Sequence, residues 1–177
     1  MHLEIILEAH QLMNQDSGYP EYYTPEFIIE AARETMGWID LDPATTKETN
    51  ALFVKAETIF TKEDDGLSQT WFGNIWMNHP FGRKRNPLWI NKLVNEYENG
   101  HVRSACCVTF ASTSEGWFQP LTNYAQCYLV LRLKYFNFEG KKFSPPKGSV
   151  VTYLGPDNGK FYECFHMYGN IMTKMHL

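Results

Sequence analysis

The tetrapeptide Asn78-His79-Pro80-Phe81 combines side chains that can hold and stack a nucleobase. The Asn78 amide offers an acceptor oxygen and two N–H donors on one group. Pro80 stiffens the turn and leaves a neighbouring backbone carbonyl free as a second acceptor. Two acceptors aimed at an exocyclic amine turn its nitrogen lone pair toward an electrophile, as N-methylation of a base requires. On these four residues alone, an Asx turn followed by a core Phe is favoured.

A second polar turn, Asp42-Pro43-Ala44, has the same position relative to an apolar segment. Residues 38–41 and 74–77 are predicted strands, and each of the two turns directly follows one of them. Ligands of α/β sheets bind in the crevice at the carboxyl ends of the strands. The shared placement of the two turns is therefore the first indication of a functional site.

The elements around these turns alternate between helix and strand. Thr24-Pro25 predicts a helix start, with Thr24 at the N-cap and Pro25 at the first helical position, and the helix ends near Gly37. Pro87 opens the clearest helix, which Gly100 ends. The near-continuous apolar run 102–110 is typical of a strand covered on both faces. Further strands are expected at 125–133, 135–138 and 149–154, and further helices at 2–13, 115–121 and 161–168.

This order predicts one α/β domain over residues 1–177. We expect a mostly parallel sheet with helices on both faces and an antiparallel C-terminal part. Residues 44–70 are rich in loops, and the piece at 51–59 is helical or extended.

Composition and charge exclude several classes of protein. No run of 18 apolar residues is present, so no transmembrane helix is expected. The four cysteines form no C-x-x-C pair, which indicates buried, reduced thiols in a cytoplasmic protein and no metal site. Residues 1–70 hold 14 acidic and 4 basic side chains (−10), whereas residues 71–177 hold 6 and 12 (+6). One surface could therefore face a polyanion, although charge alone favours a solvated loop at Arg83-Lys84-Arg85.

Five segments, taken in order, resemble the small phage-type Dam-like DNA N6-adenine methyltransferases. Their order and spacing are more specific than any one of them, and the resemblance covers most of residues 19–155. The segments are Tyr22-Tyr23-Thr24-Pro25, Leu41-Asp42-Pro43-Ala44, Asp64-Asp65-Gly66-Leu67 with Trp71, Ile75-Trp76-Met77-Asn78, and the Asn78-His79-Pro80-Phe81 motif itself.

The resemblance implies a Rossmann-like methyltransferase fold, S-adenosylmethionine as methyl donor, and adenine in double-stranded DNA as acceptor. It implies that Tyr23, Thr24 and Pro25 line the methionine end of the cofactor. It places Asp42, Pro43 and Ala44 in the turn after the first strand, and Asp64 or Asp65 at the cofactor's adenine or ribose. Asn78 and Pro80 would frame the target amine, Phe81 would stack on the flipped base, and Arg83, Lys84 and Arg85 would hold phosphates.

The chain departs from the family pattern at two places. His79 stands where the family usually has Pro; its backbone carbonyl is still an acceptor, and its imidazole suggests a pH-sensitive site. The turn after Asp42 also lacks the glycines of larger methyltransferases. Three alternatives stay open: methylation of cytosine N4, methylation of a protein glutamine, or an inactive DNA-binding relative. We expect a phage or prophage protein acting in the bacterial cytoplasm, as a monomer or dimer.

Overall fold

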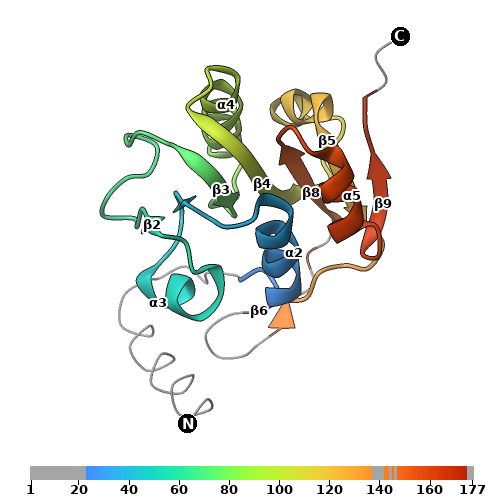
Figure 1. Ribbon diagram of the computed structural model, residues 1–177, viewed down its shortest axis with the longest axis horizontal. Coiled ribbons are helices and arrows are strands. Elements are labelled where there is room, and N and C mark those ends of the chain that lie inside the picture. Colours follow the sequence, from blue (N-terminus) through green and yellow to red (C-terminus); the bar gives the residue numbers. More distant parts are fainter. Residues whose placement is uncertain (1–22, 137–141, 144, 146, 175–177) are drawn as a thin grey trace.

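The computed structural model describes residues 23–136, 142, 143, 145 and 147–174, so the predicted helix at 2–13 lies outside the described residues. Seven strands form one sheet (Figure 1). Their spatial order is β2 (Thr58–Ile59), β1 (Leu41–Asp42), β3 (Gly73–Met77), β4 (Val102–Phe110), β8 (Ser149–Leu154), β5 (Ala125–Leu129) and β9 (Gly169–Met172). The short strands β6 (Tyr135–Phe136) and β7 (Lys142–Phe143) pair separately.

The sheet is divided between parallel and antiparallel pairing. Within the described residues, β1 pairs parallel with β2 and β3, and β3 with β4, whereas β4–β8, β8–β5 and β5–β9 are antiparallel. The expected antiparallel C-terminal part is therefore confirmed, but three parallel pairings of six do not make the sheet mostly parallel. Because β8 lies antiparallel between β4 and β5, those two strands share a direction with β1, β2 and β3.

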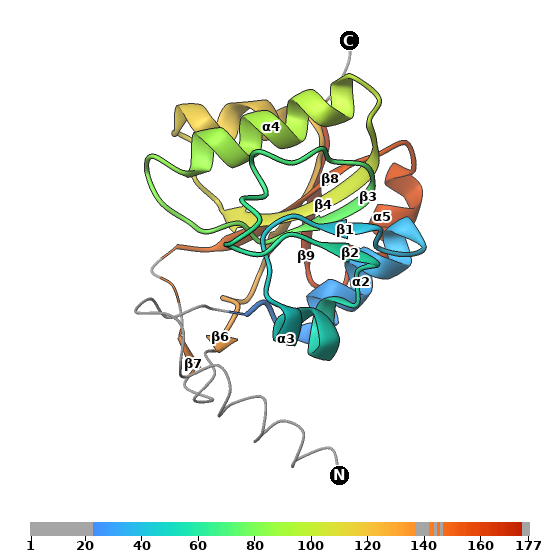
Figure 2. The ribbon, with the colours of Figure 1, turned by 90° about the vertical axis from the view of Figure 1, so that its left-hand side faces the viewer.

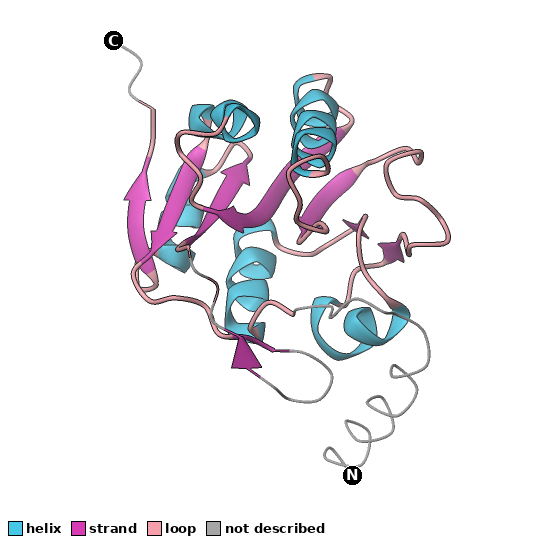
Figure 3. Ribbon diagram, turned by 180° about the vertical axis from the view of Figure 1, so that it is seen from behind, coloured by secondary structure: helices cyan, strands magenta, loops and turns pink. Residues whose placement is uncertain are grey.

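Helices cover both faces of the sheet, as predicted (Figures 2 and 3). Helices α2 (Glu26–Met36) and α5 (Asn158–Phe165) contribute Ile28, Ala32 and Phe161 to one buried cluster. Helix α4 (Asn86–Glu98) and the 3-10 helix η2 (Gly116–Asn123) contribute Trp89 and Phe118 to the cluster on the other face. The sheet is thus the middle of three layers, with a core on each side.

Helix α2 runs antiparallel to the parallel strands, from the side of their carboxyl ends back to the start of β3. It begins one residue later than expected, with Pro25 rather than Thr24 as the N-cap, and it ends at Gly37, whose φ is +86°. The Asn74 side-chain nitrogen donates to the Met36 carbonyl at 3.1 Å, which holds the end of the helix at the start of β3. The beginning of α2 therefore points toward the opposite, carboxyl edge of the sheet.

The elements with strong sequence signals form as predicted. Strand β4 spans the expected residues, and α4 begins at Asn86 with Pro87 in its first turn. Gly100, with φ +77°, lies just past the end of α4. These two elements connect to β3 in a β-α-β unit, so the end of β3 leads directly into α4.

Other segments differ from the expectations. Trp38 lies outside the strands and is 49 % exposed. Its ring N–H donates to Asp40 at 2.7 Å, and the Arg103 guanidinium lies 5.3 Å from the ring centroid. Residues 47–59 form α3 (Lys47–Thr49), the π-helix η1 (Asn50–Val54) and β2. Strand β5 ends at Leu129, and β9, which no pattern predicted, follows α5.

All four cysteines are free and buried, as expected of core thiols. Among the described helices, none combines the length and apolar character needed to cross a lipid bilayer.

Candidate functional site

The two polar turns lie at the same edge of the sheet. Strands β1 and β3 are parallel neighbours, with Leu41 opposite Ile75. Asp42 ends β1 and Asn78 follows the last residue of β3, so both come at the carboxyl ends of adjacent strands. Strand β2 flanks β1 on its other side, so the chain order reverses direction between β1 and β3. Such a switch point is where ligands of α/β sheets bind.

Trp89 connects three of the motif segments. Its ring stacks on the His79 ring, with centroids 6.2 Å apart and 27° between planes. Gly66 packs against Trp89 and against Pro43, because a Cβ on Gly66 would lie 3.3 Å from the Trp89 ring and would overlap the Pro43 carbonyl oxygen. Trp71 fixes Gly66 by donating its ring N–H to the Gly66 carbonyl at 2.7 Å. The turn after β1, the loop with Gly66 and the turn after β3 therefore meet.

Asp42 is a buried carboxyl group with few partners. It is 2 % exposed, and its Oδ1 accepts the Ala44 N–H at 3.0 Å. Burial raises the pKa of Asp42 to about 7, although hydrogen bonds from Ala44 and Thr45 oppose the shift. A ligand that brought an ammonium or hydroxyl donor to this carboxylate would offset its desolvation.

The segment before α2 contains a second buried polar group. The Thr24 side chain is 2 % exposed, and its Oγ1 has no hydrogen-bond partner within the described part of the chain. Tyr23 is also buried, with its ring 5.5 Å from that of Phe136. Leaving a hydroxyl buried without a hydrogen bond costs about 1–3 kcal/mol. Because α2 begins toward the carboxyl edge of the sheet, Thr24 is a candidate ligand contact on that side, and Pro25 follows it as the N-cap of the helix.

The structure gives Asp64 and Asp65 different environments. Both are exposed, but the Asp64 carboxylate accepts bonds from the Thr61 N–H at 2.8 Å and hydroxyl at 2.7 Å, which lower its pKa. Asp65 has a φ of +51°, and its carboxylate accepts no hydrogen bond from a described residue. Asp64 therefore holds the loop in shape, while the Asp65 carboxylate is available to a ligand.

The motif after β3 presents polar and aromatic groups at different depths. Asn78 is half-buried, Pro80 is exposed, and the half-buried Phe81 ring packs 4.7 Å from the Phe110 ring. His79 is 1 % exposed, and burial lowers its pKa to about 4. Its imidazole is thus neutral near pH 7, so the expectation of a group that titrates near neutral pH is wrong.

The three cations Arg83, Lys84 and Arg85 are all exposed, in the turn between Phe81 and α4. The Gly82 carbonyl accepts the Arg85 N–H at 3.0 Å, which gives this turn a defined shape. Positive charge therefore lies within a few residues of the half-buried Phe81 ring.

Sequence reasoning missed two residues near the motif. Asn86 Oδ1 lies 3.1 Å from His79 Nε2 and accepts the Gly82 N–H at 3.0 Å. An Asn at a helix start, four residues after a Gly, is the signal that could have identified it. Thr109 is fully buried with an Oγ1 that finds no partner among the described residues. A single Thr in an apolar strand gives no such signal.

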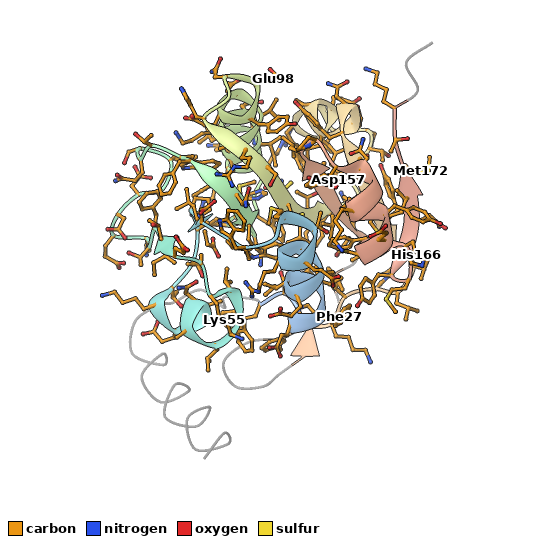
Figure 4. All side chains as sticks on the ribbon, in the orientation of Figure 1. Phe27, Lys55, Glu98, Asp157, His166 and Met172 are labelled. Carbon is orange, nitrogen blue, oxygen red and sulfur yellow. The ribbon has the colours of Figure 1, made fainter. Side chains whose placement is uncertain are left out.

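A surface groove between α2 and α5 lies apart from these residues. It is lined by Phe27, Glu30, Met167 and Tyr168, among others, and Phe27 and His166 mark this region in Figure 4. None of its lining residues belongs to the motifs, so the groove is not part of the candidate site.

The chain matches the model of a known protein family. The family model described as DNA N-6-adenine-methyltransferase (Dam) matches residues 14–156. No curated protein matches the chain. The matched region contains every candidate residue described above, from Tyr23 to Thr109.

Proposed function

Because the chain belongs to the DNA N-6-adenine-methyltransferase (Dam) family, we propose that it transfers a methyl group from S-adenosylmethionine to the N6 amine of an adenine flipped out of double-stranded DNA. The observation that supports this most is the meeting of the Asp42 turn and the Asn78 turn at one edge of the sheet, around Trp89. A donor pocket and an acceptor pocket must be adjacent for direct transfer.

The residues beside β1 fit the proposed cofactor. S-adenosylmethionine, when bound, supplies a methyl group on a positively charged sulfur. The Asp42 carboxylate accepts a hydrogen bond from the cofactor's ammonium or hydroxyl groups, and the Thr24 hydroxyl gains the partner it otherwise lacks. Tyr23 and Pro25 line the methionine end, Pro43 and Ala44 form the turn, and Asp65, rather than Asp64, contacts the ribose or adenine.

The motif after β3 holds the acceptor. Asn78 Oδ1 and the backbone carbonyl of His79 accept the two hydrogens of the adenine N6 amine, so its lone pair points at the methyl carbon. The nitrogen bonds to that carbon as the carbon–sulfur bond breaks, and the extra proton then leaves to solvent. Asn78 and His79 contribute by positioning the amine, because neither residue forms a covalent bond with it.

Phe81 and the adjacent cations hold the DNA. The part of the Phe81 ring not packed on Phe110 stacks on the flipped base, which offsets part of the cost of unstacking it. Arg83, Lys84 and Arg85 bind phosphates beside the extruded nucleotide, and Pro80, exposed between them and Asn78, borders the base.

Mass spectrometry of nucleosides tests the proposal. Unmethylated double-stranded DNA is incubated with the protein and with S-adenosylmethionine that carries a labelled methyl group. The DNA is then digested to nucleosides. We expect N6-methyladenine. N4-methylcytosine, label transferred to a protein glutamine, or DNA binding without any transfer would each contradict the proposal and would identify the alternative that holds.

A further inference from the structure

We propose that the His79–Asn86 hydrogen bond is a positioning device that fastens the turn at residues 78–82 to helix α4. The bond restricts the backbone of this turn, as a proline ring at position 79 would. The inference rests on the proposed function, because it assigns the bond the task of holding Asn78 and Phe81 in place for methyl transfer.

The hydrogen bonds of Asn86 determine which imidazole nitrogen carries the hydrogen. Asn86 is 8 % exposed, and its Oδ1 accepts the Gly82 backbone N–H at 3.0 Å, so this atom is the amide oxygen. A carbonyl oxygen has a second lone pair, and His79 Nε2 lies 3.1 Å from the same atom. Nε2 is therefore the donor, and Nδ1 of the neutral ring keeps its lone pair.

The His79 ring is also held on its faces and edges. It stacks on Trp89, and the Phe81 ring meets it edge-on with centroids 5.2 Å apart. Asn86 and Trp89 both belong to α4, so this helix contacts the His79 ring through a hydrogen bond and through a stacked ring. The flanking residues Asn78 and Phe81 are thereby fixed relative to a rigid element.

A double-mutant cycle tests the positioning role. Asn86→Ala should lower the methylation rate constant kcat about tenfold or more, with the affinity for S-adenosylmethionine within about threefold of wild type. In a His79→Pro background, the same substitution should cost less than about threefold, because the ring constraint replaces the bond. Asn91→Ala, an exposed residue of the same helix, is the control and should leave kcat unchanged.

Equal losses from Asn86→Ala in both backgrounds would overturn the proposal, as would a loss confined to cofactor affinity. If His79→Pro does not fold, His79→Phe replaces it, because Phe keeps an aromatic ring without either nitrogen. Asn86→Ala should then add less than about threefold to His79→Phe, and independent, multiplying losses would contradict a shared bond.

Nitrogen-15 NMR of the full chain without DNA separates this inference from the proposed function. We expect the His79 ring to be the neutral tautomer with hydrogen on Nε2. Hydrogen on Nδ1 would overturn the His79–Asn86 assignment. Failure of wild type to methylate DNA would refute the proposed function while leaving these spectra to decide on the bond.

Discussion

Gly66 lies so close to Pro43 that a single added carbon on Gly66 would occupy the position of the Pro43 carbonyl oxygen. The loop that carries Asp64 and Asp65 is thus seated directly on the turn after β1. Gly66→Ala should destabilise the protein by about 1–3 kcal/mol and weaken S-adenosylmethionine binding, because the loop or the turn must move. Urea unfolding and calorimetry measure the two effects.

Gly116→Ala is the matched control for this prediction, since a Cβ at Gly116 meets no atom within 4 Å. It should leave both stability and cofactor affinity near the wild-type values. If Gly66→Ala behaved like the control, the loop would not be seated on the turn as described.

Asp42 should make the cofactor-free protein less stable as the pH rises. Its folded pKa is about 7 against an ordinary 3.8, so the folded state binds more protons than the unfolded state between these values. Stability attributable to Asp42 is therefore present below pH 4 and lost as the pH rises through 7, by on the order of 4 kcal/mol. Asp42→Asn should remove this dependence in urea unfolding at a series of pH values, and an unchanged slope would contradict burial of the carboxyl group.

His79 should make the protein more stable as the pH rises, which is opposite to the effect of Asp42, over an overlapping pH range. Its folded pKa is about 4 against an ordinary 6.5, so its contribution is full above pH 6.5 and is lost as the pH falls through 4, by roughly 3 kcal/mol. The two groups partly cancel in wild type. In the same unfolding series, Asp42→Asn should gain stability with rising pH and His79→Phe should lose it. Slopes of the same sign in both variants would show that one assignment is wrong.

Cofactor affinity should also depend on the Asp42 charge. A donor from the cofactor favours the ionised carboxylate, so affinity should rise with pH and level off above about 7. Binding near pH 6.5 should release a proton, which calorimetry detects as a heat that changes with the buffer. Asp42→Asn should bind more weakly and without proton release; the same release in that variant would assign it to another group.

Arg83 and Lys84 should control the salt dependence of DNA binding. Each phosphate contact adds about 0.9 to the slope of log affinity against log salt concentration, so Arg83→Ala with Lys84→Ala should lower that slope by about 1–2. Replacing Lys160 and Lys174 by Ala removes the same charge from the region of α5 and β9 and should leave the slope unchanged. Equal effects from the two pairs would place the DNA surface elsewhere.

The sequence predicts elements whose boundaries are marked by particular residues. Pro87 and Gly100 delimit α4, and the apolar run of β4 is long enough to identify. Strand β1 has only two residues, too few for any periodicity, and β9 begins with Gly169, a residue that also ends helices. That glycine is needed in the strand because a Cβ would overlap the Tyr128 carbonyl.

The candidate site was predictable to the extent that its residues follow strands directly. Asp42 and Asn78 could be placed at one edge of a sheet from their positions alone. The burial of His79 could not, because it depends on Trp89 and Asn86 packing from a helix whose angle to the sheet no local pattern encodes. The difference between Asp64 and Asp65 likewise depends on one bonded neighbour, Thr61.

The most direct test of the account compares methyl transfer with cofactor binding in a single variant. Asn78→Ala removes the proposed amine acceptor and leaves the residues around Asp42 in place. Transfer to adenine should fall by at least about 100-fold, while calorimetric affinity for S-adenosylmethionine stays within about threefold of wild type. An Asn78→Ala protein that still methylates DNA at the wild-type rate would contradict the central claim that this turn holds the target amine.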